Sequence, residues 1–413
     1  MTLKFESPES RFFCAPYDHF LLAYVFIFLP FADMVTGWLV LSSSLTEGGF
    51  GSPSQIFRAI LLPLLFFRLA VGVRPVWAIL PIFLLFIETV HVFFHQSLLA
   101  YSYGIIFFSR IIYLCMLYAF LVELYKSRMA GIIFKYMACS VILIALSLVF
   151  AFITDTGFST YGWGFGTKGY FASGNGLGLN LGVSTLLLLY IFHAGLNNGL
   201  YVRVGIFFGL LAIFLIGSKT AWLLGGIVII SYFCFRYFGF MLFVLFPIVF
   251  GFLILFGGKL NRFFDVIVSR YNSSPDFLTF ITSGRNDYFY DAWLVYMGSS
   301  PGFLNFLFGK GFYCSFRVCD SVVFFDTLES DLADIFFMYG LIGVCLYFSF
   351  FIYFVFLFFM RKKYFLCFVW LLVFGHSAVA GHVMQNGMNL TLMAVFVALA
   401  YFILTSFSDE TIK

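Results

Sequence analysis

The sequence predicts an all-α polytopic membrane protein, with about twelve transmembrane helices and one large loop outside the membrane. The 413-residue chain is 62% hydrophobic and only 10% charged, and its mean hydropathy is +1.03. Apolar runs of about 20 residues recur along it, which is the length needed to cross a bilayer core of about 30 Å. These runs are apolar on every side, whereas the strands of a membrane barrel alternate apolar and polar residues.

The apolar runs define the predicted spans in chain order. Polar residues and glycines separate most of them, but only three residues interrupt the pair 201–217 and 220–235, which predicts either a tight hairpin or a broken helix. The first 17 residues are polar and the first run has membrane length, so no cleavable signal peptide is expected. The predicted spans are 19–42, 55–72, 76–95, 100–123, 131–153, 174–193, 201–217, 220–235, 238–256, 332–360, 364–382 and 388–407.

The placement of basic residues predicts the orientation of the chain. Short cytoplasmic connections retain an excess of Lys and Arg. With the N-terminus inside, every predicted inner connection carries basic residues, including the triplet Arg361, Lys362 and Lys363. The predicted outer connections 43–54, 96–99 and 383–387 contain no Lys or Arg. Both termini are therefore predicted to be cytoplasmic, and the chain 1–413 is read as a single integral membrane domain.

The large outer loop, residues 259–331, is the expected working part of the molecule. It is the one long stretch too polar for lipid, and it concentrates charge in a chain with little charge elsewhere. Basic residues on the outer side run against the usual bias, although long loops are partly exempt from it. Charge kept at a membrane interface commonly serves a ligand, a counter-ion or lipid headgroups.

Arg285 is the first candidate for anion binding. It lies in Thr282-Ser283-Gly284-Arg285-Asn286-Asp287, ahead of a predicted short helix at 287–297 that Ser283 would cap. A guanidinium beside a helix N-terminus suits phosphate oxygens. The alternative is an arginine that anchors headgroups or forms a salt bridge within the loop.

Lys219 is the second basic candidate, because a charge between two apolar spans is costly unless it has a function. Arg270 is a weaker candidate that could instead pair with a nearby aspartate. Arg58 is expected to extend its charge to the interface from a helix end.

Glu329, Asp331 and Asp334 form an acidic group at the outer end of the span 332–360. Acidic residues in a first turn commonly cap a helix and offset its dipole. Three carboxylates exceed that requirement, and mutual repulsion would raise at least one pKa, as a general base toward a hydroxyl requires. Both interpretations remain open.

The remaining polar candidates are isolated. His382 lies at the outer end of the eleventh span and is either an interfacial residue or part of the site, while Asn175 opens the sixth span, where an amide can cap a helix. Cys314 and Cys319 could form a disulfide if their loop faces an oxidising compartment. No cluster has metal-ligand spacing, so neither a metal nor another cofactor is expected.

The order of these motifs resembles the bacterial O-antigen and exopolysaccharide repeat-unit polymerases of the Wzy type, with a more distant similarity to O-antigen ligases. The resemblance extends from about residue 172 to the C-terminus, and the first span fits it more loosely. Each motif is short, and their sequential order carries the resemblance. The motifs are Ser173-Gly174-Asn175, Ser218-Lys219, Ser283-Gly284-Arg285-Asn286, Phe308-Gly309-Lys310-Gly311, Glu329-Ser330-Asp331 with Asp334, Tyr339-Gly340-Leu341-Ile342-Gly343, and Gly381-His382.

The resemblance implies a membrane glycosyltransferase of the lipid-dependent, GT-C-like class. It implies a bacterial inner membrane location, a periplasmic active site, and undecaprenyl-diphosphate-linked oligosaccharide and polysaccharide as substrates within the lipid bilayer. A chain-length regulator protein is a further candidate partner. Arg285 and Lys219 would hold diphosphate, with Arg270 and Asn175 also in the substrate site. Glu329, Asp331, Asp334 or His382 would act as the base.

Three functions remain as alternatives at this point. The ligase pattern has an arginine where this chain has Lys219, which argues against bidentate binding of diphosphate at that position. It also has a histidine near the position of the acidic Glu329, and this difference favours the polymerase over the ligase. A flippase or transporter is less favoured, because its ionisable groups should lie near the midplane and its halves should repeat. The net charge of +4 is too small to indicate a nucleic-acid partner.

Overall fold

The structure is a computed structural model of the whole chain. It describes residues 15–44, 51–70, 98–126, 129–161, 165–234, 284–298, 301–312, 328–381 and 383–406, with isolated positions 86, 89–90, 265, 268–269, 271–275, 277 and 279. The chain divides into two units, each discontinuous in sequence. The first comprises Met1–Phe67 and Glu123–Asn272, and the second comprises Arg68–Val122 and Ser273–Lys413.

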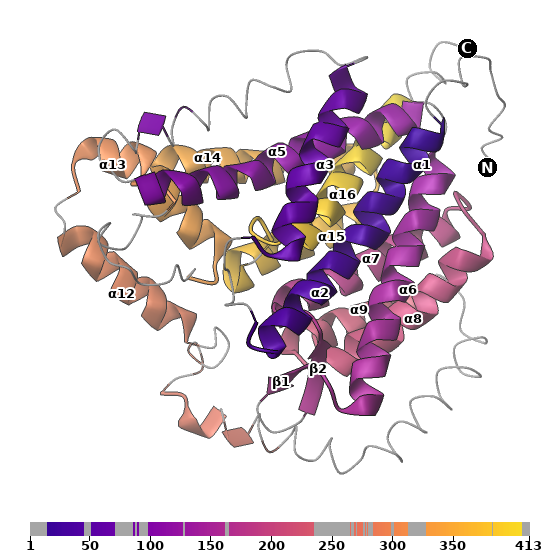
Figure 1. Cartoon of the computed structure of the whole chain (residues 1–413), viewed down its shortest axis with the longest axis horizontal. Helices are drawn as coiled ribbons and strands as arrows, with labels where there is room; N and C mark the ends of the chain where they lie inside the picture. The colour runs from indigo at the N-terminus through magenta and orange to yellow at the C-terminus, as the bar shows by residue number, and fades with distance from the viewer. Residues whose placement is uncertain are drawn as a thin grey trace. The chain divides into compact units, whose positions relative to one another are not determined.

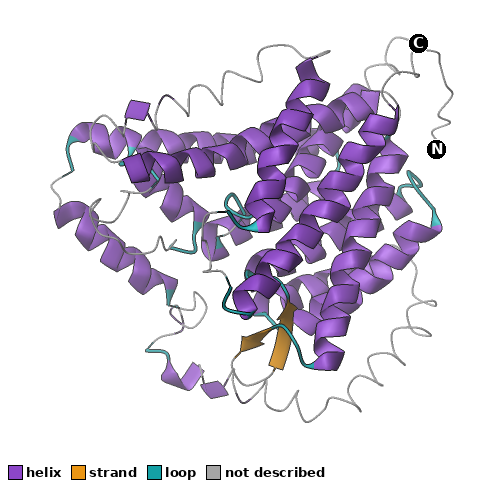
Figure 2. Ribbon diagram, viewed as in Figure 1, coloured by secondary structure: helices purple, strands orange, loops and turns teal. Residues whose placement is uncertain are grey.

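Helix dominates the described residues, as the composition predicts (Figure 2). Within the part of the chain that the structure describes, five helical stretches are long and apolar enough to cross a membrane: Pro16–Leu41, Gly104–Lys126, Ala130–Thr154, Gly174–His193 and Asp331–Met360. Shorter apolar helices occupy Leu200–Ile216, Lys219–Phe233, Tyr364–Ala380 and Gly387–Ile403. These lengths and compositions agree with an all-α, multi-pass membrane protein.

Most predicted spans coincide with a described helix. The predicted spans 76–95 and 238–256 fall almost entirely outside the described residues, as do several parts of the loop 259–331, including residues 313–327. The sixth predicted span, 174–193, has the same bounds as its helix. The predicted short helix 287–297 is also present, with bounds Arg285–Gly298.

The first unit begins with a continuous helical rod. Helix α1 (Ala15–Ala23) passes through a π-helical turn, η1 (Tyr24–Phe28), into α2 (Leu29–Leu41). The wide turn comes just before Pro30, whose nitrogen has no hydrogen to donate to the preceding turn. Helix α3 (Pro53–Ala70) packs beside this rod, and its carbonyls at Phe57 and Leu64 accept hydrogen bonds from the hydroxyls of Tyr24 and Tyr17.

Four further helices pack together in the first unit (Figure 1): α6 (Ala130–Thr154), α7 (Gly174–His193), α8 (Leu200–Ile216) and α9 (Lys219–Cys234). Glycines let their backbones approach closely, as membrane helices require. A Cβ at Gly209 of α8 would lie 2.2 Å from the Thr185 hydroxyl of α7, and one at Gly182 of α7 would lie 2.7 Å from Leu224 of α9.

The turn between α8 and α9 is a tight helical hairpin, one of the two alternatives that the sequence leaves open. Gly217 ends α8 with a left-handed φ of 71°, and Ser218 begins the next helix by accepting the amide hydrogen of Ala221 at 3.2 Å. The two helices then pack side by side, with the rings of Phe214 and Trp222 5.7 Å apart.

A small β-hairpin is a described element that the sequence analysis does not predict. Strands β1 (Phe158–Tyr161) and β2 (Phe165–Gly169) pair antiparallel between α6 and α7. The hairpin packs on α6 and α8, and the hydroxyl of Thr160 donates to the carbonyl of Ile216 at the end of α8. Figure 1 shows the strands at one end of these helices. A hydrogen bond from the Asn197 amide to the Gly131 carbonyl lies at the other end.

The second unit contains six helices among its described residues: α5 (Leu98–Lys126, to Val122), α12 (Arg285–Gly298), α13 (Phe303–Phe308), α14 (Asp331–Met360), α15 (Tyr364–Ala380) and α16 (Gly387–Ser406). Aromatic rings fill the space between α14, α15 and α16. Trp370 is fully buried, donates to the carbonyl of Phe351 at 3.0 Å, and packs on Phe396.

Helix α14 is broken near its start by a glycine. Gly340 has φ 64° and ψ −159°, so the helix kinks there. The kink frees the carbonyls of Phe337 and Met338, which accept hydrogen bonds from the amides of Lys310 and Gly311 at 3.1 and 2.9 Å. The motif Phe308-Gly309-Lys310-Gly311 of the predicted loop and the motif that contains Gly340 in the predicted span are therefore in direct backbone contact.

Candidate functional site

Helix α12 is positioned by an apolar face that packs on the first turns of α14. Ala292 and Tyr296 of α12 are buried against Leu328, Ala333 and Phe337. At the other end of α12, Gly284 takes a φ of 83° and its amide donates to the Thr279 carbonyl. This packing brings the N-terminus of α12 to the segment that precedes α14.

Arg285, the first residue of α12, forms an ion pair with Glu329. The distance from Nη2 to Oε2 is 2.5 Å. The two partners differ in exposure, because the arginine side chain is 12% exposed and the glutamate side chain is 42% exposed. The cation is therefore held within the protein at a helix N-terminus, where negative charge is favoured, and the carboxylate lies on its open side.

Asp331 is the most heavily hydrogen-bonded carboxylate of the group. It is 1% exposed. Its Oδ2 accepts from the hydroxyl of Ser377 at 2.7 Å and from the amides of Val383 and Met384 at 2.9 and 3.1 Å. Asp331 therefore ties the start of α14 to α15 and to the turn that follows α15.

Asp334 is equally buried and performs a similar task. Its Oδ1 accepts from the amide of Leu328 at 3.0 Å, and its Oδ2 accepts from the side-chain amide of Gln385 at 2.9 Å. Ser330, which directly precedes Asp331, caps α14 by accepting a hydrogen bond from the amide of Ala333. These contacts fit the capping interpretation, but they extend beyond one helix and fix the turn between α15 and α16.

Glu329 is held in place through its backbone. It adopts a φ of 55°, which is unusual for a residue with a side chain. A Cβ at Gly381 would lie 2.5 Å from the carbonyl carbon of Glu329, so the two backbones are in close contact. The Ser330 hydroxyl donates to the Ala378 carbonyl at 2.6 Å, which secures the same segment against α15.

Lys310 adds a cation next to α12, and it was not among the predicted site residues. Its Nζ lies 4.7 Å from the centre of the Tyr296 ring on α12, a distance typical of a cation–π contact. Burial lowers the pKa of Lys310 and raises the pKa of Tyr296. The signal for Lys310 was its place in the Phe-Gly-Lys-Gly motif.

The first unit gathers other predicted candidates around two helix N-termini. Ser173 caps α7 and Ser218 caps α9. A Cβ at Gly178 of α7 would lie 3.1 Å from Ala221 of α9, so the first turns of both helices are in contact. Lys219 opens α9, which brings a cation to the paired N-termini.

Two neighbouring residues complete this arrangement. Asn175 lies in the first turn of α7 and is partly exposed. The aliphatic part of Lys168, on β2, packs over Gly174. Helix N-termini with nearby lysines favour anions.

A partly buried ion pair in the first unit involves Arg58, whose Nη2 donates to both carboxylate oxygens of Asp33 at 2.7 and 2.8 Å. The expected extension of Arg58 to the membrane interface stays a prediction. Sequence reasoning missed the pair because it depends on how α2 packs on α3. An ion pair between membrane helices is costly and commonly has a role in function or in helix registry.

The predicted site residues therefore fall into three groups. Arg285, Glu329, Asp331 and Asp334 come together in the second unit, and Lys219 and Asn175 lie in the first. His382, Arg270, Cys314 and Cys319 lie outside the described residues. Among the residues that the structure describes, no group of three or more His, Cys, Asp or Glu side chains could hold a metal ion.

Comparisons with protein-family models, with curated proteins and with solved structures find no match to this chain.

Proposed function

We propose that this protein is a surface-polysaccharide polymerase of the Wzy type. It would transfer a growing glycan from undecaprenyl diphosphate onto a single lipid-linked repeat unit, at the periplasmic face of the bacterial inner membrane. The observation that carries the proposal is the Arg285–Glu329 pair, a mostly buried guanidinium at a helix N-terminus with a half-exposed carboxylate on its open side. The order of motifs in the sequence supplies the choice of substrate class.

The reaction needs two groups that this pair can supply. A hydroxyl of the acceptor sugar attacks the anomeric carbon of the growing chain and forms a new glycosidic C–O bond. The bond from that carbon to the diphosphate oxygen breaks, and the diphosphate leaves with the electron pair. A cation is needed to stabilise the leaving diphosphate, and a base is needed to take the proton of the hydroxyl.

Arg285 fits the first role in this proposal. A guanidinium forks onto phosphate oxygens, and the N-terminus of α12 adds favourable partial charge. A diphosphate at this position would compete with Glu329 for the same guanidinium. Substrate binding would therefore release the carboxylate from its ion pair.

Glu329 fits the second role better than its neighbours. The side chains of Asp331 and Asp334 are buried and already accept hydrogen bonds from the protein, so we assign them to positioning. Glu329 has the exposure to reach a hydroxyl. Once released from Arg285, it would be close to the leaving group and able to accept a proton.

The ligase and the flippase remain alternatives. An acidic residue at position 329 favours the polymerase, because the ligase pattern has a histidine near this position. The carboxylates lie at the end of α14 rather than in its middle, whereas a transporter site is expected near the midplane. This placement argues against the flippase.

The test is glycan laddering in cells that lack the chain and carry it back as wild type, Arg285→Ala, Glu329→Gln or Arg361→Ala, at matched expression. Arg361 follows α14 at its other end and is the control. Loss of one transition-state donor commonly lowers the rate by about 10²–10³. We therefore expect Arg285→Ala and Glu329→Gln to leave core plus one repeat unit, while Arg361→Ala gives a full ladder.

Two outcomes would contradict the proposal. Loss of even the single-unit band in the complete deletion would indicate the ligase or the flippase. A normal ladder from both Arg285→Ala and Glu329→Gln would remove these residues from the site.

A further inference from the structure

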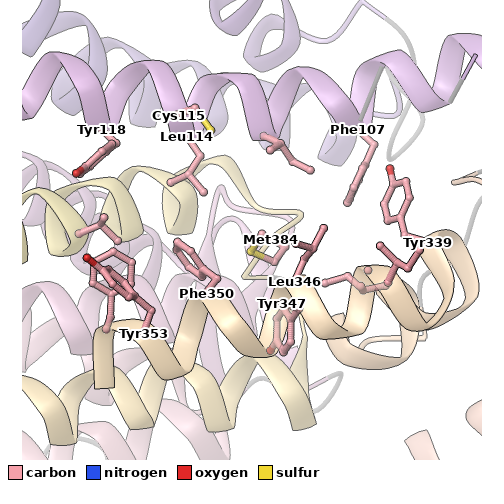
Figure 3. Close-up of a pocket in the computed structure, with 16 residues that line it drawn as sticks. Phe107, Leu114, Cys115, Tyr118, Tyr339, Leu346, Tyr347, Phe350, Tyr353 and Met384 are labelled. Atoms are coloured by element: carbon pink, nitrogen blue, oxygen red, sulfur yellow. The ribbon is translucent and has the colours of Figure 1, made fainter. Parts of the chain in front are cut away.

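A long apolar cavity lies within the second unit, between α5 and α14. Its volume is about 440 Å³. One wall comes from α5, including Phe107, Leu114 and Tyr118, and the other comes from α14, including Tyr339, Leu346 and Tyr353. Figure 3 shows these side chains facing one another across the space between the two helices.

The cavity follows α14 for several turns. Its lining on this helix runs from Ile335 to Phe354 and includes residues on both sides of the kink at Gly340. After the kink, the lining from Ile342 to Phe354 corresponds to about 18 Å of helix at 1.5 Å per residue. A space that extends along a helix in this way fits an extended hydrocarbon chain better than a compact molecule.

One end of the cavity adjoins the site described above. Ile335 lies one helical turn after Asp331, and the side chain of Met384 lines the cavity while its amide donates to Asp331 at 3.1 Å. An amphiphile with its chain in the cavity would therefore have its head at the end of α14 that carries Glu329. The arrangement pairs a polar site for a head with an apolar channel for a tail.

Apolar side chains that line the cavity are exposed and available for contact with a bound molecule. Leu346 is 45% exposed, although it is a large apolar residue in a membrane-spanning helix. The lining is almost entirely apolar, with aromatic rings from both helices. A hydrocarbon chain in the cavity would make van der Waals contacts with these rings and aliphatic side chains.

We infer that the cavity between α5 and α14 binds the polyisoprenoid chain of a lipid-linked diphosphate, with the diphosphate at the Arg285–Glu329 end. This inference rests on the proposed function for the identity of the lipid. The cavity volume accommodates only the part of a long chain that is nearest the head.

The test is photolabelling of the purified full-length protein in nanodiscs. Geranyl diphosphate and geranylgeranyl diphosphate analogues, each with a photoreactive group at the chain end, serve as short and long probes. The labelled peptides are mapped by mass spectrometry. The long probe is expected to label the lining segments of α5 and α14, and an excess of phosphatidylglycerol should not compete.

A blocking variant separates chain binding from folding. Leu346→Trp fills the middle of the cavity, while Ile352→Trp is the control, because Ile352 is exposed on the same helix and does not line the cavity. Leu346→Trp should weaken labelling by the long probe at least about tenfold, since several buried CH₂ groups lose their place. It should leave labelling by the short probe unchanged, which a misfolded variant would not do.

The results that would overturn the inference are specific. Long-probe labelling that is unaffected by Leu346→Trp, that maps away from α5 and α14, or that phosphatidylglycerol abolishes would remove the cavity as an isoprenoid site. Labelling requires no glycan transfer. A protein labelled in the cavity that does not support laddering would contradict the polymerase alone, and a laddering protein without this label would contradict the cavity alone.

Discussion

The three carboxylates at 329, 331 and 334 lie within six residues but have different environments. Glu329 is half-exposed and paired with Arg285, whereas the two aspartates are 1% exposed and accept hydrogen bonds from α15 and the turn after it. The difference arises because Glu329 precedes α14 in a left-handed conformation, while the other two lie in its first turn. A buried acceptor with several donors stabilises a fold, and an exposed one can meet a substrate.

Replacing Asp331 should therefore lower stability rather than affect chemistry alone. Asp331→Ala leaves the Ser377 hydroxyl and two backbone amides without their acceptor, and buried donors without partners cost about 1–3 kcal/mol each. We expect a loss of about 3 kcal/mol, measured as a lower unfolding midpoint in detergent. Asp291→Ala, on the exposed face of α12, should change it by less than about 0.5 kcal/mol. Equal midpoints for the two variants would contradict this assignment.

Lys310 gives a prediction about pH. Burial lowers its pKa below the usual 10.5, so between the lowered pKa and 10.5 the unfolded chain binds more protons than the folded protein. The contribution of Lys310 to the free energy of unfolding therefore increases as the pH rises through that window. The raised pKa of Tyr296 acts in the opposite direction, but only above about pH 10.

The measurement is the unfolding midpoint from about pH 7 to about pH 10. Lys310→Met keeps an aliphatic chain and removes the titrating group, so its midpoint should rise less than that of the wild type. Lys362→Met, exposed at the other end of α14, should follow the wild type. If the unfolding midpoints of the wild type and Lys310→Met change with pH in the same way, Lys310 does not cause the pH dependence.

The sequence identifies the residues of the second-unit cluster but not their roles. Arg285 and the acidic group stand out because charge is rare in this chain. Which carboxylate meets the guanidinium depends on how α12 packs on α14, through Tyr296 and Phe337, and no local pattern encodes that contact. The Arg58–Asp33 pair was missed for the same reason, because it joins two different helices.

Among the elements, helix α14 depends on a glycine at its kink. Gly340 adopts φ 64° and ψ −159°, a region that essentially only glycine occupies. A Cβ there would lie 2.4 Å from the carbonyl carbon of Leu307, so neither the backbone angle nor the space tolerates a side chain. The kink also provides the carbonyls that hold Lys310 and Gly311.

Gly340→Ala should therefore destabilise the protein by more than about 2 kcal/mol, since strain of about 1–3 kcal/mol adds to a backbone clash. Gly375→Ala in α15 is the matched control, because a Cβ there meets nothing within 4 Å. It should be neutral or stabilise by up to about 1 kcal/mol through helix propensity. The two midpoints in detergent should move in opposite directions or differ clearly, and similar losses in both would contradict the role of the kink.

Hydropathy predicts the helices well because lipid requires an uninterrupted apolar run with internal hydrogen bonds. It predicts neither the kink at Gly340 nor the π-helical turn before Pro30, because both lie within runs that stay apolar. The hairpin was missed because strands of only four and five residues are too short to show an alternating pattern. Its position depends on contacts with the ends of α6 and α8.

For the whole molecule, the directions of the described helices agree with the predicted order of spans within each unit. Across the cavity, Tyr339 packs on Phe107 at one end and Tyr118 faces Tyr353 at the other (Figure 3), so α5 and α14 run in the same direction. The predicted fourth and tenth spans should run in the same direction, as these helices do. In the first unit, the hairpin and the α8–α9 turn lie at one end, as two outer connections should.

Topology is therefore testable with two positions. In a variant without native cysteines, Asp291→Cys places a thiol on α12, which is predicted to be periplasmic, and Asn198→Cys places one in the connection between α7 and α8, which is predicted to be cytoplasmic. Both positions are exposed.

A membrane-impermeant maleimide should label position 291 in cells whose inner membrane is intact, and position 198 only after that membrane is permeabilised. The reverse pattern would place the Arg285–Glu329 pair on the cytoplasmic side and would contradict a polymerase that acts at the periplasmic face. Labelling of both positions in intact cells would contradict the charge-based orientation, because Lys and Arg placement predicts that they lie on opposite sides.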